Sequence, residues 1–408
     1  MFNFRSASFF IFIFFQISSA QIIWTKYAGN PVLTPGINDA WDAGLLQVDA
    51  VQYDGETYHM WYTSLKDRTP PASIGYATSP DGITWIKYES NPVFSPGGSV
   101  TVLISDSLFH MWYGRTDDSG DSIIGYATSQ DGINWNIYPE NPVLSPGVPG
   151  SWDELGVQQP SVLFDEQGFH MWYHSPTGSG SFKIGYASSE DGIDWVKSDD
   201  PVLLFGESGT WDDSEVISPN VVKKDSVFHM LYQGSNGQVS RLGYAVSDDG
   251  IVWSKSESNP VLGPGMTGSW EEQGIASPTL LFDGSIFHLW YSGVDYDNNW
   301  QIGYASTTLT NSLENPNNQL YSYNLSQNYP NPFNPVTTFS YQLRLNSDVE
   351  LSIYNLLGQK VAILVDKRLP AGNYNVHWNA AGFSSGVYIY TLETNTGFKQ
   401  SRKLLLIK

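Results

Sequence analysis

The chain has 408 residues, of which 41% are hydrophobic and 14% are aromatic, so it has the material for a large core. It contains no cysteine, which excludes disulfides and thiol catalysis. The formal net charge of −21 argues against nucleic acid or an anionic membrane as a partner, whereas neutral sugars or a cation stay compatible with it.

The first twenty residues have the pattern of a secretory signal peptide. Arg5 supplies a positive charge, residues 9–15 (FFIFIFF) form an apolar core, and Ser18-Ser19-Ala20 is a small-residue cleavage site. This apolar run is too short to span a bilayer. We therefore expect residues 1–20 to direct export and then to be removed.

Residues 21–310 contain five copies of one strand pattern. Each copy has a strand of the type His-Met-Trp-Tyr, and these strands begin at His59, His110, His170, His229 and His288. An Ile/Leu-Gly-Tyr-Ala strand follows. In four copies it leads into a Ser-x-Asp-Gly-Ile-x-Trp turn, with the aspartates Asp81, Asp131, Asp191 and Asp249. Aromatic and β-branched residues at period two are typical of half-buried strands.

The fifth copy lacks this turn, and the missing half stands at the start of the repeat region. There, residues 22–24 (IIW) and 30–33 (NPVL) match the end of the other copies. A repeat that begins and ends in mid-copy closes into a ring. We therefore predict an all-β fold with a five-bladed β-propeller at residues 21–310, whose N-terminal strand completes the last blade.

Features that recur from copy to copy are interpreted as structural. The five histidines are compatible with a metal-binding ring, but their constant aromatic neighbours favour core packing. Four copies carry an acidic residue after a tryptophan, which we interpret as a wedge between blades, with sugar stacking as the alternative: Trp41-Asp42, Trp152-Asp153, Trp211-Asp212 and Trp270-Glu271. The second copy lacks this Trp-Asp segment, because its spacing from Pro92 to His110 is 18 residues instead of 28. This short loop is expected to open one side of the ring.

Catalytic residues should break the symmetry, since a reaction needs a few unlike groups at one place. Ten residues before each repeated histidine, where the inner strand begins, stand Asp49, Val100, Pro160, Pro219 and Pro278. Fourteen residues before it, the four long copies have Leu45, Gly156, Glu215 and Gly274. Asp49 and Glu215 are the lone acids in these two sets. Two carboxylates on one face suit glycoside hydrolysis, with one as base or nucleophile and the other as acid. The alternative is that each is an ordinary loop carboxylate.

Further departures from the repeat are expected on the same face. Arg115, Gln158 and His174 are candidates for substrate contacts through hydrogen bonds, and Trp300 is a candidate for stacking on a pyranose ring. The loop residues Asp67-Arg68 belong to the same group. No metal ligand set and no cofactor is predicted, although a structural cation in the central channel stays open.

Residues 21–310 resemble a known clan of five-bladed propellers. The segment 48–51 (VDAV), followed by the strand at residues 58–64 (YHMWYTS), is similar to the first blade of arabinanases, β-xylosidases, invertases and levansucrases. This resemblance implies that Asp49 is the base or nucleophile. It also implies a further Asp at the head of the second or third inner strand, where this chain has Val100 and Pro160.

The glutamate that serves as general acid in this clan does not stand at its usual position in this chain. It usually stands two residues before the proline of a later inner strand, where this chain has Gln158, Ile217 and Ala276. Glu215 stands two residues before Ile217, and the alternation of side chains keeps it on the same strand face. We expect a secreted enzyme that hydrolyses glycosidic bonds in a polysaccharide or oligosaccharide. The alternative is a non-catalytic glycan-binding or adhesive propeller of the same fold.

A second β-rich unit is predicted at residues 323–408, after an Asn/Ser-rich linker at 311–322. It carries a net charge of +4, from 8 basic and 4 acidic residues, whereas the rest of the chain carries −25, from 12 basic and 37 acidic residues. Its alternating strands are typical of a small Ig-like β-sandwich.

The second unit resembles the type A C-terminal sorting domain of the type IX secretion system. The resemblance lies in residues 329–335 (YPNPFNP), 353–361 (IYNLLGQKV), 386–388 (GVY) and the basic, apolar end. It implies a Bacteroidota-type envelope, recognition by the type IX machinery and export across the outer membrane. The protein is then expected to be monomeric and either secreted or attached to the cell surface. An independent sugar-binding sandwich is the alternative.

Overall fold

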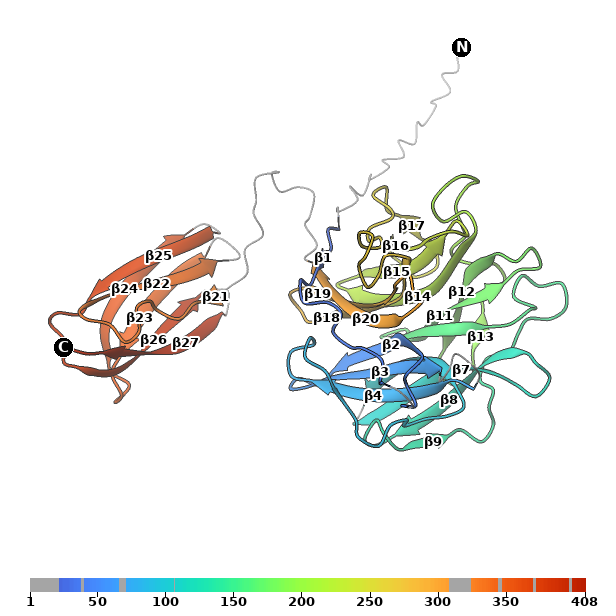
Figure 1. The fold of residues 1–408 in the computed structure, drawn as a ribbon, viewed down its shortest axis with the longest axis horizontal. Coiled ribbons are helices and arrows are strands. Elements are labelled where there is room, and N and C mark those ends of the chain that lie inside the picture. Colours follow the sequence, from blue (N-terminus) through green and yellow to red (C-terminus); the bar gives the residue numbers. More distant parts are fainter. Residues whose placement is uncertain are drawn as a thin grey trace, which may run out of the picture. The chain divides into compact units, whose positions relative to one another are not determined.

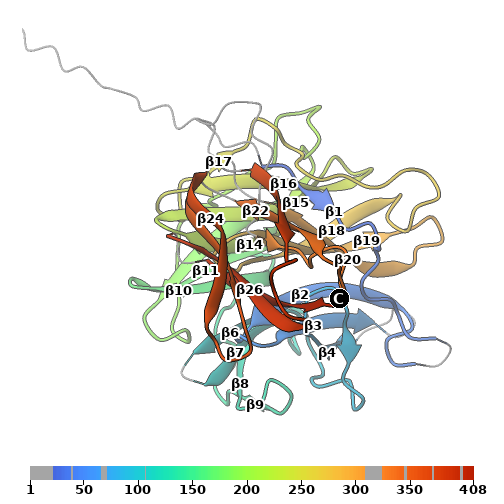
Figure 2. The same cartoon turned by 90° about the vertical axis from the view of Figure 1, so that its left-hand side faces the viewer.

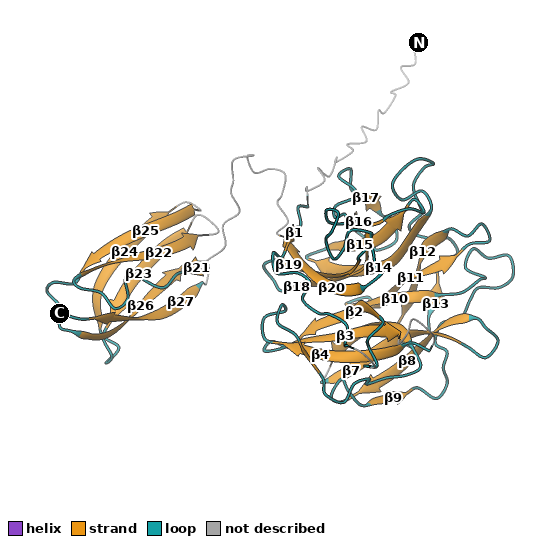
Figure 3. Cartoon of the chain, in the orientation of Figure 1, coloured by secondary structure: helices purple, strands orange, loops and turns teal. Residues whose placement is uncertain are grey.

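The computed structural model describes residues 22–37, 40–65, 71–105, 107–307, 324–343, 347–369, 372–395 and 398–408. These residues form strands and loops and contain no helix (Figure 3). None of them therefore belongs to a helix long and apolar enough to cross a membrane. Contacts divide the chain into two compact units, Met1–Ser312 and Leu313–Lys408. The predicted signal peptide and linker lie outside the described residues.

The first unit contains five blades of four antiparallel strands each, and one parallel residue pair, Phe182 with Glu215, joins the third blade to the fourth (Figure 1). Blade 1 comprises β2 (Leu45–Tyr53), β3 (Tyr58–Leu65), β4 (Ser73–Ser79) and β5 (Ile86–Lys87). Blade 2 comprises β6 (Gly98–Ser105), β7 (Leu108–Thr116), β8 (Ser122–Ser129) and β9 (Trp135–Ile137). Blade 3 comprises β10 (Gln158–Asp165), β11 (Gly168–Pro176), β12 (Phe182–Ser189) and β13 (Val196–Lys197). Blade 4 comprises β14 (Glu215–Lys224), β15 (Val227–Ser235), β16 (Ser240–Ser247) and β17 (Ser254–Lys255).

Blade 5 is completed by the start of the chain. Its strands β18 (Gly274–Phe282), β19 (Phe287–Val294) and β20 (Trp300–Thr307) are followed in the sheet by β1 (Thr25–Lys26) (Figures 1 and 2). Thr25 pairs with Ser306, and Leu33 bridges to Ile302. Each inner strand contacts the next, and β18 contacts β2, so the ring is closed. The predicted propeller and its N-terminal closure are confirmed.

The core lies between the blades. Five apolar clusters each combine residues of two consecutive blades. The cluster that joins the last blade to the first contains Trp290 and Ile302 together with Val48 and Tyr62. Burial of such aromatic side chains stabilises a chain that has no disulfides, because each removes a large apolar area from water.

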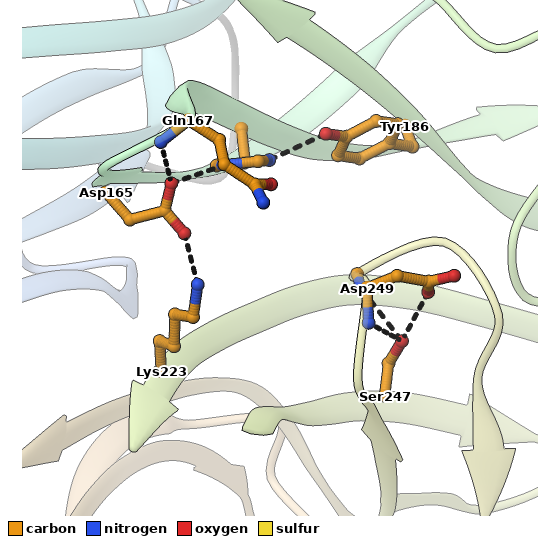
Figure 4. A network of polar contacts seen from close by, with 8 residues as sticks. Asp165, Gln167, Tyr186, Lys223, Ser247 and Asp249 are labelled. Carbon is orange, nitrogen blue, oxygen red and sulfur yellow. Dashed lines mark hydrogen bonds and ion pairs between the residues drawn. The ribbon is translucent and has the colours of Figure 1, made fainter. Parts of the chain in front are cut away.

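The repeated histidines are packing residues, as their repetition predicts. In every blade the imidazole Nδ1 lies 2.5–2.8 Å from a tyrosine hydroxyl of the neighbouring strand, in the pairs His59–Tyr76, His110–Tyr126, His170–Tyr186, His229–Tyr244 and His288–Tyr304. In blade 3, Asp165 also binds His170 and pairs with Lys223 of blade 4 (Figure 4). The described residues include no cluster of acidic or histidine side chains suited to a metal ion.

An indole hydrogen bond links consecutive blades. Trp61 Nε1 donates to the Gly132 carbonyl in the turn of blade 2 at 2.8 Å. Equivalent bonds of 2.7–2.8 Å join blade 2 to 3, 3 to 4 and 5 to 1, in the pairs Trp112–Gly192, Trp172–Gly250 and Trp290–Gly82. Blade 4 has Leu231 at this position, and blade 5 is the blade that lacks the turn. Because blade 5 has no turn carbonyl to accept the bond, blade 4 needs no indole donor, and it has Leu231 instead.

The Trp-Asp segments hold the outer part of four blades. Each tryptophan packs against a tyrosine ring of its own blade and borders the cluster shared with the preceding blade, which fits the wedge interpretation. The buried carboxylate pairs at 2.5–2.6 Å with a lysine of the blade's last strand, in the pairs Asp42–Lys87, Asp153–Lys197, Asp212–Lys255 and Glu271–Lys26. Blade 2 lacks both partners. Ile137 takes the place of the lysine, and Phe94 packs on Tyr113 with ring centroids 4.8 Å apart.

The second unit consists of two sheets with one apolar core. One sheet has the order β21 (Asn324–Leu325), β22 (Val336–Leu343), β25 (Gly372–Asn379). The other has the order β24 (Lys360–Leu369), β23 (Ser347–Tyr354), β26 (Gly386–Thr394), β27 (Lys399–Leu406). Buried side chains from both sheets form one cluster that includes Phe339, Trp378 and Tyr390. This is the predicted small sandwich.

Deletion of residues 21–34 is expected to unfold the propeller, because it removes β1 and the buried side chains of Ile22 and Trp24. Two neighbours give a matched test. Ile22 is 4% exposed and Ile23 is 63% exposed. Ile22→Ala should lower the free energy of unfolding by about 2–5 kcal/mol, whereas Ile23→Ala should change it by less than about 0.5 kcal/mol. Urea denaturation measures both, and equal effects of the two substitutions would refute this mode of closure.

Candidate functional site

The inner strands begin on one face of the ring, which we call the mouth. Each inner strand has an irregular register, or β-bulge, close to this end. In four blades the bulge contains a residue with φ of 47–53°, namely Ser99, Gln159, Ser218 and Ser277. A positive φ is costly for a residue that carries a side chain, so these bulges need local support.

Side chains of the preceding blade support the bulges. At 2.9–3.4 Å, four bulge amides donate to them, in the pairs Val48–Ser292, Ser99–Thr63, Ser218–His174 and Ser277–Gln233. All four acceptors stand at one repeat position, four residues after the repeated histidine. Blade 2 has Gly114 there, so no side chain is available for the bulge of blade 3.

His174 belongs to this framework. Its Nδ1 accepts the hydrogen bond from the Ser218 amide, and its Nε2 lies 3.2 Å from Gln158 Oε1. The imidazole is therefore neutral with its proton on Nε2, and burial lowers the pKa of His174 to about 3. Because both ring nitrogens have protein partners, His174 positions Gln158, while its direct contact with a sugar stays a prediction.

Asp49 stands in the bulge of β2, where the mouth meets the central channel. It lines both the channel and a small cavity between the five bulges. Thr63 Oγ1 donates to Asp49 Oδ2 at 2.5 Å, and Gln47 Nε2 donates to Oδ1 at 3.0 Å. The side chain keeps partial solvent access through these cavities, although protein atoms surround it. No cation pairs with Asp49 among the described residues.

Burial raises the pKa of Asp49 from 3.8 to about 7, although the hydrogen bonds from Thr63 and Gln47 oppose this shift. The free energy of hydration that the ionised form loses on burial is larger than the free energy that these two hydrogen bonds supply. A carboxyl group with a pKa near 7 exchanges its proton close to neutral pH. This property suits a general base and is more common at functional sites than elsewhere.

A larger cavity of about 550 Å³ lies beside this small one. We call it the mouth cleft; its walls include Gly98, Arg115, Gln158, Phe182 and Glu215. Glu215 begins β14, and its backbone pairs with Phe182 of blade 3. Its carboxylate has no hydrogen bond or ion pair with any described residue, and burial raises the pKa of Glu215 above its ordinary value of 4.5.

The two candidate carboxylates face neighbouring cavities. Ser99 and Gln159 line both the mouth cleft and the small cavity that contains Asp49. Gln159 Nε2 lies 3.4 Å from Ser99 Oγ, and Gln47 Nε2 lies at the same distance from it. A polar wall thus connects the surroundings of Asp49 with those of Glu215. The arrangement places two carboxyl groups on one face of the ring. Asp49 has a pKa of about 7, and Glu215 has no protein partner among the described residues.

Of the other predicted contact residues, some line the mouth cleft and some do not. Arg115 and Gln158 line the mouth cleft with Glu215. Trp300 lies in blade 5, donates its indole N–H to Asn298 at 2.9 Å, and lines none of the cavities described above. Asp67-Arg68 lies outside the described residues. The contacts of these side chains with a substrate stay predictions.

Sequence reasoning missed the residues that hold Asp49. Gln47, Thr63, Ser99 and Gln159 are small or neutral, so no search for charged side chains finds them. A usable signal existed for Gln47, because it is a polar residue only two positions before Asp49. No third acid joins Asp49 and Glu215 in the described walls of the mouth cleft or the channel cavities.

Comparison with protein families identifies the second unit. Residues 327–408 match the family described as secretion system C-terminal sorting domain. The second unit is therefore a sorting domain of the type IX system, which directs export to the cell surface or the medium. The sequence resemblance predicted this address.

Curated relatives match parts of the chain. One is the A type blood N-acetyl-alpha-D-galactosamine deacetylase of Flavonifractor plautii, 24% identical over 43% of this chain and 25% of the relative. Another is 1,2-beta-oligomannan phosphorylase of Thermoanaerobacter, 25% identical over 33% of this chain and 43% of the relative. An uncharacterized protein of Mycobacterium tuberculosis is 32% identical over 39% of this chain and 52% of its own length. The chain thus spans a quarter to about half of these relatives.

Solved structures share the fold over a wider range. A glycosyl hydrolase from Bacteroides ovatus covers 70% of this chain and 93% of its own, with a TM-score of 0.57 and 16% identity. A thermostable family-43 glycoside hydrolase covers 71% and 99%, with a TM-score of 0.54 and 18% identity. The first unit therefore has the propeller fold of glycoside hydrolases of the family-43 type.

Asp49→Asn should stabilise the protein at high pH. The folded wild type keeps the Asp49 proton up to about pH 7, whereas an ordinary carboxyl group releases it near 3.8. The free energy of unfolding of the wild type therefore falls between these pH values. The asparagine variant lacks this loss and should gain about 1–3 kcal/mol on the wild type between pH 4.5 and 8. Urea denaturation at both pH values measures the gain. Asp118→Asn, at an exposed residue, is the control. If the difference in unfolding free energy between Asp49→Asn and the wild type does not change with pH, Asp49 is not protonated in the folded state up to about pH 7.

Removal of residues 323–408 should leave a folded propeller in the periplasm of its host, because it can no longer cross the outer membrane. The sorting domain carries the address, and it has an apolar core of its own. Fractionation of cells that express the full and truncated chains measures this, with thermal melting of the purified truncation as the folding control. Release of the truncated chain into the medium at the full-length level would show that the address lies elsewhere.

Proposed function

We propose that the propeller is a secreted enzyme that hydrolyses glycosidic bonds in a polysaccharide or oligosaccharide at its mouth. Asp49 acts as base or nucleophile, and Glu215 acts as the acid that protonates the leaving oxygen. The observation that carries this proposal is the pair of symmetry-breaking carboxyl groups, each with a raised pKa, in two cavities that share a wall.

The surroundings of Asp49 support the first role. Thr63 and Gln47 fix the two carboxylate oxygens, so the group is held in one orientation before a substrate arrives. Its pKa of about 7 leaves a large ionised fraction at neutral pH. No lysine or arginine neutralises it within the described residues, which keeps the carboxylate available as a base.

The surroundings of Glu215 support the second role. Burial favours the protonated form of its carboxyl group, as a general acid requires. The group has no protein partner among the described residues, so its proton is free to reach a leaving oxygen in the mouth cleft. Two of the curated relatives are named for the deacetylation or phosphorolysis of glycans, which supports a carbohydrate ligand without fixing the reaction.

A glycan-binding propeller without hydrolytic activity is the second candidate. It is favoured by one observation. The described walls of the cavities hold two acids, whereas the resembled clan is expected to have three, and Val100 and Pro160 stand at the implied positions of the third. Such a protein would keep the mouth cleft as a binding site and lose turnover.

Asp49→Asn should reduce turnover by on the order of 100-fold or more with little change in substrate binding, because it removes the ionised base and preserves its shape. Wild-type activity should rise as the pH passes about 7, where Asp49 ionises. Initial rates of reducing-end release measure both effects. Asp118→Asn, in an exposed loop of the mouth, is the matched control. A fully active Asp49→Asn variant would leave only the binding function.

Glu215→Gln should impair substrates with poor leaving groups more than activated aryl glycosides, because only the former need a proton from the enzyme. The ratio of the two rates, in variant and wild type, measures this selectivity. An equal loss on both substrates would assign Glu215 to binding instead of acid catalysis.

A further inference from the structure

Arg115 occupies a repeat position that is small and buried in every other blade. The position stands five residues after the repeated histidine, and its other occupants are Ser64, Ser175, Gly234 and Gly293. Ser64 and Ser175 are at most 1% exposed. Arg115, in contrast, is exposed and lines the mouth cleft. This change from a small buried residue to a long charged one occurs in blade 2 alone.

The missing Trp-Asp segment explains the space for this side chain. In blade 4, a Cβ atom added to Gly234 would lie 2.7 Å from the ring of Trp211, so a long side chain has no room there. Trp270 excludes a Cβ at Gly293 in the same way. The blades that carry Trp41 and Trp152 have the small residues Ser64 and Ser175 at this position. Blade 2 has no tryptophan there, because its loop is ten residues shorter (28 minus 18). The shortened loop thus accommodates the guanidinium on the surface of the mouth cleft.

The guanidinium of Arg115 is available to a ligand. Although the chain has 41 acidic residues, none of the described ones forms an ion pair or hydrogen bond with Arg115. The cleft beside it includes Gly97, Gly98 and Gly114, which lets a ligand approach the backbone closely. Arg115 is the only lysine or arginine among the described residues of the cleft. Its planar group suits two parallel hydrogen bonds to a carboxylate or sulfate.

We infer that the mouth cleft takes a glycan with an anionic sugar residue, either a uronic acid or a sulfate ester, whose negative group binds Arg115. The inference rests on the proposed function for the glycan nature of the ligand, but not for hydrolysis. The rest of the chain, without residues 323–408, carries a net charge of −25, so it repels a densely charged polyanion. The fitting ligand is therefore a largely neutral glycan with isolated acidic residues.

The test uses the full-length Asp49→Asn protein and an array of oligosaccharide triplets that are identical except at carbon 6 of one hexose. The three forms carry a hydroxymethyl group, a carboxylate or a 6-sulfate. The carboxylate or sulfate form should bind on the order of 10-fold more tightly than the neutral form. The favoured anionic member distinguishes a uronic acid from a sulfate ester.

Three arginine variants complete the test. Arg115→Gln should remove the preference, so that the anionic and neutral forms bind with equal affinity. Arg241→Gln makes the same charge change at the start of β16, outside the cleft, and should keep the preference. Arg115→Lys should retain part of it, since charge remains without the paired hydrogen bonds. Unchanged melting temperatures show that the variants are folded.

Each outcome has a separate meaning. Equal binding of neutral and anionic forms, no binding of any triplet, or an equal loss in both glutamine variants would overturn the inference. Hydrolysis of neutral glycans by the wild type without an anionic preference would overturn it while the proposed function stands. An anionic preference that depends on Arg115, in a protein without hydrolytic activity, would support the inference and refute the proposed hydrolysis.

Discussion

The fold depends on the hydrogen bond from a buried indole of one blade to a turn carbonyl of the next. This bond joins four of the five pairs of consecutive blades, and aromatic clusters fill the space beside it. The last of these bonds joins Trp290 of blade 5 to Gly82 of blade 1, so it closes the circle. The exception at Leu231 fits the same rule, since the next blade has no turn to accept the bond. Closure of the ring brings the five inner strands together around one channel.

The candidate functional residues lie where this repetition is broken. The repeated positions are occupied by groups that satisfy one another, as the lysine–carboxylate pairs show. Asp49 and Glu215 instead have no cationic partner among the described residues, and burial disfavours the charge of each. A fold rarely retains such a group for stability. The short loop of blade 2 is a third break, and it lines the cleft that Arg115 and Glu215 share.

Much of the fold could be predicted because the repeat is internal to the sequence. Five copies of one pattern show which residues pack, and the incomplete fifth copy shows how the N-terminal strand must pair. The candidate Asp49 comes from the same comparison, since one acid among prolines and valine stands out. The supporting residues Thr63, Gln47 and Ser99 could not be found this way. Their importance comes from contacts across blades, such as the bond from Ser99 to Thr63, which depend on the twist of sheets that the sequence does not specify. The sequence could not show that His174 is an uncharged support of the blade 4 bulge, because its partner Ser218 is 44 residues away.

The central claim is that Asp49 and Glu215 act on one glycosidic bond. A crystal structure of the Glu215→Gln protein with a bound oligosaccharide tests it most directly. The account predicts a sugar across the shared wall of the two cavities, with the glycosidic oxygen in hydrogen-bond reach of residue 215. The anomeric carbon should face the Asp49 carboxylate, either directly or through one water, and the separation of the two groups would then give the stereochemical outcome. An oligosaccharide bound in the mouth cleft with Asp49 out of reach of every glycosidic bond would contradict the claim.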